Sequence, residues 1–105
     1  MARRTFSRAT LTFLREMPSE DALALLAIYH KVDPNYLPTK DPQSRRWHAR
    51  TAAGEFEILT TGPHKWYDTR AKIGGGGAID LAMHVLQLSF VDAVRLLMER
   101  GHPRG

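Results

Sequence analysis

The sequence predicts an α+β domain in which a small antiparallel β-meander of three to four strands packs against an N-terminal helix and two C-terminal helices. Two observations predict this class. Apolar residues recur at helical spacing over residues 19–32 and again over 77–100, whereas residues 45–71 alternate aromatic, β-branched and polar side chains between short turns. With 105 residues, the chain (1–105) is expected to form a single domain.

The N-terminal part is predicted to hold one helix after a basic arm, residues 1–8. Residues 11–14 are expected to add a short helical turn, which Pro18 ends because proline cannot continue a helix. Ser19 stands as an N-cap before two acidic residues that suit the positive end of a helix. The apolar stripe that follows predicts a mostly buried helix over residues 19–32.

The middle third of the chain is predicted to form the sheet. Three prolines between residues 33 and 44 indicate an extended loop that leads into it. Three short runs rich in aromatic and β-branched residues follow, separated by two glycine-containing turns, and we expect each run to be one strand of a meander. The three runs are residues 45–51, 55–61 and 65–70.

Four consecutive glycines, Gly74–Gly77, are predicted to form a tight turn between the last strand and the C-terminal helices. Glycine lacks a Cβ atom, so its backbone can approach surfaces that other residues would block. Residues 78–88 have one apolar face and predict a helix, and residues 90–100 predict another. Ser89, with Asp92 three residues later, resembles a capping box at the start of the second helix.

The composition excludes several classes of function. The chain has no cysteine, which excludes disulfides, a thiol nucleophile and cysteine-bound zinc. Its five histidines are scattered, and the sequence shows no acid pair, nucleophile–base pair or metal-ligand cluster. We therefore expect neither an enzyme nor a bound metal or cofactor. No apolar run approaches the ~18 residues of a transmembrane helix and no signal peptide is recognisable, so we expect a cytoplasmic protein without a membrane partner.

The charge distribution favours an anionic partner. The net charge is +4, and residues 44–72 carry six lysines and arginines against three acids. Alternate side chains of a strand share a face, so Arg46, His48 and Arg50 would form a row of phosphate partners. An exposed ring in the run 65–70 would stack on an unpaired base. The predicted DNA-contacting residues are Arg45, Arg46, Trp47, His48, Arg50, Lys65, Trp66, Tyr67, Arg70 and Lys72.

These assignments have simpler structural alternatives. The first run is also typical of a solvated strand with Trp47 in the core, and at least one ring of Trp66 and Tyr67 is expected to pack against the C-terminal helices. Glycine amides at a helix N-terminus can bind phosphate, although this run fits neither common nucleotide-binding motif. A plain strand-to-helix turn is therefore the alternative to a phosphate-contacting turn made by Gly75, Gly76 and Gly77.

Several segments carry a resemblance to a known family. Trp66-Tyr67 stands where that family has an aromatic pair, residues 76–81 match its glycine turn and helix start, residues 88–94 match its last helix, and residues 47–49 match the segment before its first metal ligands. Over residues 47–97 the chain resembles the zinc-binding domain of bacterial replicative primases and of related proteins encoded by plasmids and other mobile elements. The resemblance implies a zinc-ribbon-like sheet that binds DNA.

The family's zinc ligands are absent from this chain. The two knuckle cysteines of the family fall on Thr69 and Lys72, and the upstream ligand pair has no counterpart after Arg50. The chain therefore resembles a zinc-free member. A structural zinc contributes ~10 kcal/mol or more to such a fold, so hydrophobic packing is expected to replace it. Besides the three helices, the residues expected to supply that packing are Trp47, Phe56, Ile58 and Trp66.

The resemblance implies an accessory module that contacts single-stranded DNA and supports priming, replication or transfer of a plasmid or another mobile element. The sequence lacks the catalytic part of a primase, so a primase, helicase or relaxase would be supplied in trans. Two alternatives stay open. One is a protein–protein adaptor that keeps the fold without zinc or DNA binding. The other is a small nucleotide-binding enzyme, which rests on the glycine run alone.

Overall fold

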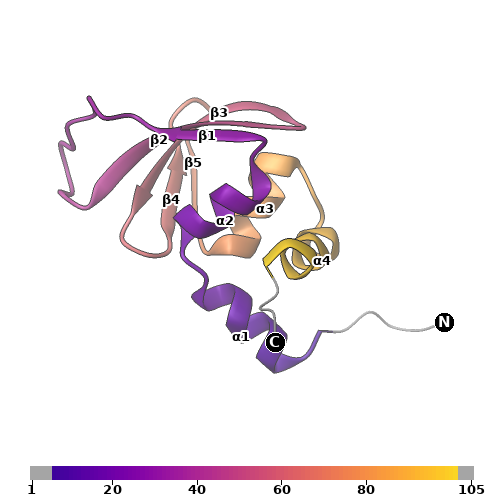
Figure 1. Ribbon diagram of the computed structural model, residues 1–105. Coiled ribbons are helices and arrows are strands. Elements are labelled where there is room, and N and C mark those ends of the chain that lie inside the picture. Colours follow the sequence, from indigo (N-terminus) through magenta and orange to yellow (C-terminus); the bar gives the residue numbers. More distant parts are fainter. Residues whose placement is uncertain (1–5, 102–105) are drawn as a thin grey trace.

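The computed structural model describes residues 6–101, which form four helices and five strands (Figure 1). The predicted α+β class is confirmed, with five antiparallel strands where the sequence predicted three to four. In chain order the elements are α1 (Arg8–Glu16), α2 (Ser19–Leu26), β1 (Tyr29–Val32), β2 (Ser44–Thr51), β3 (Gly54–Thr61), β4 (Lys65–Asp68), β5 (Ile73–Gly76), α3 (Ala78–Leu86) and α4 (Phe90–Gly101).

The five strands form a simple meander in the order β1-β2-β3-β4-β5, with every neighbouring pair antiparallel. The helices gather on one side of this sheet, below it in Figure 1. Because side chains alternate along a strand, the register divides the sheet into two faces. We call the side toward the helices the covered face; its residues include Trp47, Ala49, Phe56, Ile58, Thr60, Trp66 and Asp68.

The core lies between the covered face and the helices. Ile58 and Trp66 are buried there, and Trp47 and Phe56 are partly buried against them. The helices contribute the remaining buried side chains, among them Leu14, Leu23, Leu81, Val85, Val94 and Leu97. The four residues that were expected to replace a zinc site by packing therefore all belong to this core or lie against it.

The N-terminal helix predicted over residues 19–32 is shorter than expected. α2 ends at Leu26, and the next residues become the edge strand β1. The Ile28 N–H donates to the Arg50 carbonyl at 2.8 Å, and the Asp33 N–H donates to the Arg46 carbonyl at 2.8 Å. Pairing with β2 thus satisfies the backbone of a segment whose local pattern also suits a helix.

The start of the chain also differs from the prediction. The basic arm was placed on residues 1–8, of which residues 1–5 lie outside the described part of the chain. Arg8 already begins α1, and the Ser7 hydroxyl caps this helix by accepting the Thr10 N–H at 3.0 Å. Ser19 is not a cap: its hydroxyl donates to the His64 carbonyl at 2.8 Å and so ties α2 to the turn between β3 and β4.

The glycine run is mostly strand rather than turn, because Gly74–Gly76 pair with β4 as part of β5. The two rings on β4 explain why this strand is made of glycine. A Cβ atom on Gly74 would lie 3.1 Å from Cδ1 of Tyr67, and one on Gly75 would lie 2.6 Å from Cζ2 of Trp66. Gly75 therefore has no room for a side chain, whereas Gly74 could take a small one only if the Tyr67 ring moved slightly. The turn itself is Gly77, at φ 90°.

The predicted C-terminal helical pair is present as α3 and α4. The Ser89 hydroxyl accepts the Asp92 N–H at 3.1 Å, as the capping pattern predicted. Within residues 6–101 no single helix is long and apolar enough to cross a membrane; α3 and α4 pass such a test only as a pair, and that pair is bent by 108°.

Candidate nucleic-acid interface

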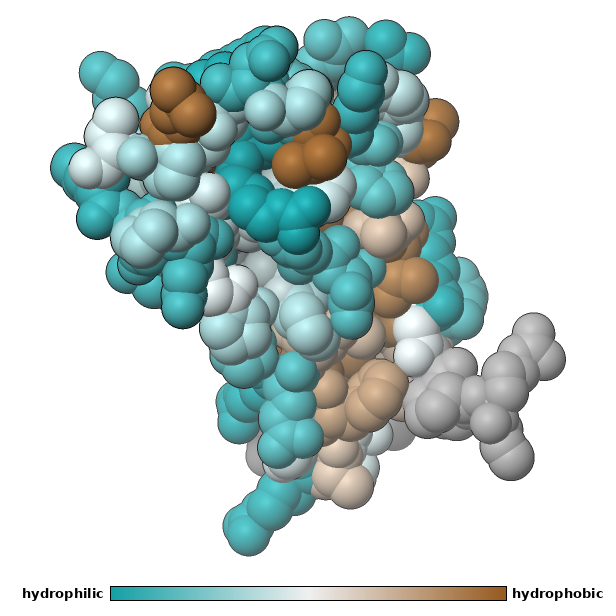
Figure 2. Space-filling model, turned by 60° about the vertical axis from the view of Figure 1, so that its left-hand side comes forward, coloured by the Kyte–Doolittle hydropathy of each residue, from teal (hydrophilic) through white to brown (hydrophobic). Residues whose placement is uncertain are grey.

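The side of the sheet away from the helices carries most of the predicted contact residues that remain accessible. We call this side the open face; its residues are Tyr29, Lys31, Arg46, His48, Arg50, Glu55, Glu57, Leu59, Lys65 and Tyr67. Strand alternation places them on one side. Each residue of the set either pairs with another member on the neighbouring strand or lies two residues from one on its own strand. Figure 2 shows hydrophilic residues over most of the sheet end of the molecule, with isolated hydrophobic ones among them.

Two tyrosine rings on the open face are accessible to a ligand. Tyr29 on β1 is 51% exposed and Tyr67 on β4 is 40% exposed. The Tyr67 ring lies beside Gly74, its register partner on β5, where a Cβ atom would come within 3.1 Å of Cδ1. Tyr29 was not among the predicted contacts, because its segment was assigned to a helix; the β-forming character of Ile28–Val32 was the signal that could have found it.

Arg46 lies on the open face, but its guanidinium is already occupied. Its Nε donates to Asp33 Oδ2 at 3.0 Å and lies 3.6 Å from Glu57 Oε2, and its plane stacks over Tyr36 at 5.0 Å. The hydrogen bond from Arg46 is the main reason why the pKa of Asp33 lies below its usual value, and that bond likewise raises the pKa of Arg46. Arg46 is therefore a poor free phosphate ligand in this arrangement.

The other cations of the open face are less constrained. Arg50 lies 3.3 Å from Glu55 in a pair whose two side chains are both about 60% exposed, so solvent screens their attraction. His48 lies 3.6 Å from Asp33. Lys31 and Lys65 are exposed and form no ion pair with any residue of the described chain, 6–101. These two lysines and Arg50 are the cations that a phosphate could reach most easily.

Arg45 and Trp47 point to the other side of the sheet, where they stabilise the fold. The Trp47 Nε1–H donates to the Thr60 hydroxyl at 3.0 Å, and that hydroxyl donates to Glu20 on α2 at 2.8 Å. Arg45 bonds the same Glu20 at 3.1 Å and lies 5.0 Å over the Trp47 ring. This network joins β2 and β3 to α2, which is the structural alternative that the sequence left open for Trp47.

Trp66 is also structural, since it is only 4% exposed and stacks on His84 of α3 with ring centres 5.1 Å apart. Its Nε1–H is buried and has no hydrogen-bond partner among residues 6–101. Of the two rings on β4, therefore, Trp66 packs against the helices and Tyr67 is accessible. This outcome follows from strand alternation, because neighbouring residues of β4 face opposite sides.

The buried Asp68 and the partly buried His84 form a pair that sequence reasoning missed. His84 Nε2 lies 2.7 Å from Asp68 Oδ2, and Asp68 Oδ1 accepts the Arg70 and Ala71 N–H groups at 2.9 and 3.0 Å. Burial alone would raise the pKa of Asp68, but the hydrogen bonds from Ala71, His84 and Arg70 outweigh it and hold the pKa below its usual value. Nothing in the sequence signals this pair, which joins a strand to a helix.

The turn between β4 and β5 holds the remaining predicted cations, Arg70 and Lys72, and both are exposed. Lys72 adopts a left-handed conformation with φ 60°. Thr69 and Lys72, which fall on the cysteine positions of the zinc-binding family, lie in this turn, and Thr69 bonds Glu57. Within residues 6–101, no three His, Cys, Asp or Glu side chains are placed to hold a metal ion.

The glycine amides predicted to contact phosphate have partners inside the protein. The Gly76 N–H donates to Asp80 Oδ2 at 3.0 Å, and the Gly77 N–H donates to the His64 carbonyl at 2.8 Å. Gly75 precedes them in the β5 ladder, where its register partner is Trp66. The arrangement favours the plain strand-to-helix connection over a phosphate-binding turn.

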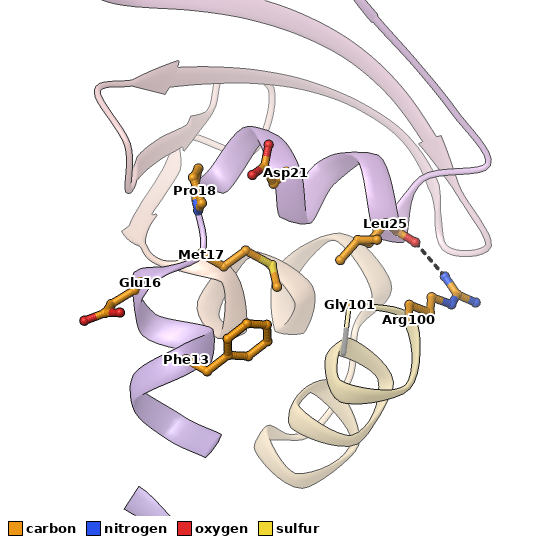
Figure 3. A pocket seen from close by; sticks show the side chains of 8 residues that line it. All are labelled: Phe13, Glu16, Met17, Pro18, Asp21, Leu25, Arg100 and Gly101. Carbon is orange, nitrogen blue, oxygen red and sulfur yellow. Dashed lines mark hydrogen bonds between the residues drawn. The ribbon is translucent and has the colours of Figure 1, made fainter. Parts of the chain in front are cut away.

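A hollow of about 580 Å³ lies away from the sheet, between α1, α2 and the end of α4 (Figure 3). Phe13, Met17 and Leu25 form its apolar part, and Glu16 and Asp21 lie at its edge. The Arg100 side chain donates to the Leu25 carbonyl at 3.0 Å and so closes one end. It brings together none of the predicted contact residues.

In comparisons with known proteins, no family model, no curated protein and no solved structure matches the chain.

Proposed function

We propose that the chain is a nucleic-acid-binding module that holds single-stranded DNA on the open face of its sheet. One observation carries the proposal: two partly exposed tyrosines share an uncovered antiparallel sheet with exposed cations. Tyr29 and Tyr67 would stack on unpaired bases, while Lys31, Arg50 and Lys65 would bind phosphates. Stacking is worth ~1–3 kcal/mol per base, so two rings could supply much of the binding free energy.

The spacing of the two rings suits a strand that crosses the sheet obliquely. Tyr29 and Tyr67 lie three strands apart, and their register partners on β3, Glu55 and Leu59, are four residues apart. With strand spacings of about 4.8 Å and rises of about 3.4 Å per residue, the rings are on the order of 20 Å apart. A short segment of single strand can span this distance and follow the cations between the rings.

The contact set proposed here is smaller than the set predicted from the sequence. It leaves out Arg45, Trp47 and Trp66, which face the helices. It also leaves out Gly75, Gly76 and Gly77, whose amides face partners inside the protein. The resemblance to primase zinc-binding domains supports the same function: an accessory module for priming, replication or transfer of a mobile element. It would work in the cytoplasm beside a primase, helicase or relaxase supplied in trans.

Fluorescence anisotropy with a labelled single-stranded oligonucleotide tests the proposal. We expect binding that weakens as salt rises, and Lys65→Ala should lower the slope of log K against log salt by about 0.7, because one phosphate contact is lost. Arg95→Ala is the matched control, since it removes an exposed cation from α4 on the helix side. No binding at low salt and tens of micromolar protein, or equal effects of the two variants, would contradict the proposal.

A second candidate, a protein–protein adaptor, is favoured by the acids of the open face. Asp33 and Glu57 pair with Arg46, and Glu55 pairs with Arg50, so this face carries both signs of charge rather than a uniform positive field. Mixed charge suits a protein surface better than a phosphate backbone. The adaptor predicts that Glu55→Gln and Glu57→Gln do not strengthen DNA binding, whereas the DNA module predicts that they do.

A further inference from the structure

We propose that the glycine strand β5 is a docking edge for an extended peptide of a partner protein, which adds a sixth strand to the sheet and places a lysine or arginine in the cleft between β5 and α3. This inference does not rest on nucleic-acid binding. It uses the edge strand β5 and a cleft on the helix side of the sheet, whereas the proposed DNA contacts lie on the open face. It rests on three features of β5: its free edge, the cleft beside it, and the charge of that cleft.

β5 is the last strand of the meander, so only β4 pairs with it. The Gly77 N–H bonds the His64 carbonyl, which fixes the phase of the ladder: Ile73 and Gly75 turn their backbone groups toward β4, and Gly74 and Gly76 turn theirs outward. Asp80 caps the outward Gly76 N–H. The N–H and C=O of Gly74 and the C=O of Gly76 thus face away from the sheet, where an added strand would bond them.

A cleft of about 520 Å³ runs beside this edge, between β5 and α3. Ile73, Phe56, Met83 and Leu88 give it apolar walls, and it continues to the Trp66–His84 stack. Ile73 is 50% exposed although it belongs to a strand at the rim of the core. Alternate side chains of a strand added to β5 would point toward this cleft, and glycine at Gly74 lets another backbone approach closely.

The charge of the cleft selects the occupant. Asp80 is its accessible acid, since Asp68 is buried and both of its oxygens are already bonded, and none of the residues that line the cleft is a lysine or arginine. Elsewhere the chain is rich in cations, with 15 lysines and arginines against 11 acids. Asp80 is exposed and accepts the Gly76 N–H with Oδ2, so its other carboxylate oxygen is available to an incoming cation. A basic side chain with an aliphatic stem matches both the apolar walls and this carboxylate.

Selection of short random peptides displayed on phage against the full chain tests the proposal, with the selected peptides resynthesised and their affinities measured by anisotropy. Gly74→Pro removes the outward N–H donor but none of the backbone hydrogen bonds to β4. Gly74→Ala keeps the donor and controls for the Cβ, which meets the Tyr67 ring in both variants. Asp80→Asn keeps an acceptor for Gly76 and removes the charge. Thermal melts of each variant verify that the fold is retained.

We expect selected peptides that alternate in polarity and are enriched in lysine or arginine at one position. Their affinity should fall roughly tenfold in Gly74→Pro, much less in Gly74→Ala, and severalfold in Asp80→Asn. Failure to select any peptide, binding that Gly74→Pro leaves intact, or selected peptides without a basic residue would overturn the proposal. Lys65→Ala should leave peptide binding unchanged, so failure here is separable from failure of the DNA proposal.

Discussion

The two faces of the sheet use the same residue types for opposite purposes. On the covered face, Trp47 and Trp66 are packed against helices, and Arg45 is bound to Glu20. On the open face, Tyr29 and Tyr67 reach solvent beside exposed cations. Strand geometry produces this division, because successive side chains of a strand point to opposite faces of the sheet. An aromatic or basic residue in such a sheet is thus informative about function only once its face is known.

The pair of Asp68 and His84 is the strongest polar feature of the covered face, and its loss should have the largest effect. Asp68→Ala removes the acceptor of two backbone N–H groups and leaves His84 without its partner. We expect unfolding in urea to show a loss of about 2–4 kcal/mol, because three hydrogen bonds to a buried carboxylate are lost at once. Asp68→Asn keeps one acceptor oxygen and should lose less. Equal stability of Asp68→Ala and the unmodified protein would refute a stabilising role for the pair.

Substitution of Gly75 tests whether β5 requires glycine because a side chain there would clash with residues of the covered face. A Cβ atom at this position would lie 2.0 Å from Asp80 Oδ2 and 2.6 Å from Trp66 Cζ2. Gly75→Ala should therefore destabilise the protein by about 1–3 kcal/mol through overpacking, measured by the same urea titration. Gly76→Ala is the control, since its Cβ would meet only the His64 carbonyl, at 3.8 Å. Similar losses in both variants would point to backbone flexibility instead of the ring contact.

Acidic pH should lower the stability of the protein, because Asp68 on the covered face becomes protonated. The pKa of Asp68 in the folded protein lies below its usual value of 3.8, so its contribution to stability is complete above that value and is lost as pH falls through the folded pKa. The free energy of unfolding should thus decline below about pH 4, and Asp68→Asn should flatten part of that decline. Asp33, whose pKa is lowered by Arg46, acts in the same direction and accounts for a remaining slope. An identical pH dependence in Asp68→Asn would argue against this origin.

The smallest effect concerns the ions of the open face. Glu55→Gln releases Arg50 from an exposed pair, so stability should change by less than about 1 kcal/mol. If the open face binds DNA, the same change should strengthen binding severalfold at low salt, because one repelling carboxylate is removed. Anisotropy at two salt concentrations measures this, and the gain should shrink at the higher one. Weaker DNA binding by Glu55→Gln would run against the proposed phosphate contacts of Arg50.

The sequence was sufficient where periodicity and turns agree. Strands β2, β3 and β4 and helices α3 and α4 were predicted within a few residues, because alternation, glycine turns and the Ser89 cap mark them. β1 was missed because residues 29–32 continue an apolar helical stripe, and only their pairing with β2 decides between strand and helix. β5 was missed because glycine is uncommon in strands, and only the pairing of this segment with β4 identifies it as one.

The candidate site was partly predictable for the same reason. Alternation correctly separated Arg46, His48 and Arg50 from Arg45 and Trp47. It could not reveal that Asp33 and Glu57 bind Arg46, since these acids come from other elements. It also could not foresee the bond from Asp80 to Gly76, which gives a glycine amide of the predicted phosphate turn an internal partner.

The most direct test of the account is a nuclear magnetic resonance titration of the full chain with a short single-stranded oligonucleotide, in which the backbone signals report which face responds. The account predicts that signals of β1, β2 and β4 shift, led by Tyr29, Lys31, Lys65 and Tyr67, while signals of α2 and α4 stay in place. Shifts confined to the helices, or no shifts at low salt, would contradict a nucleic-acid interface on the open face.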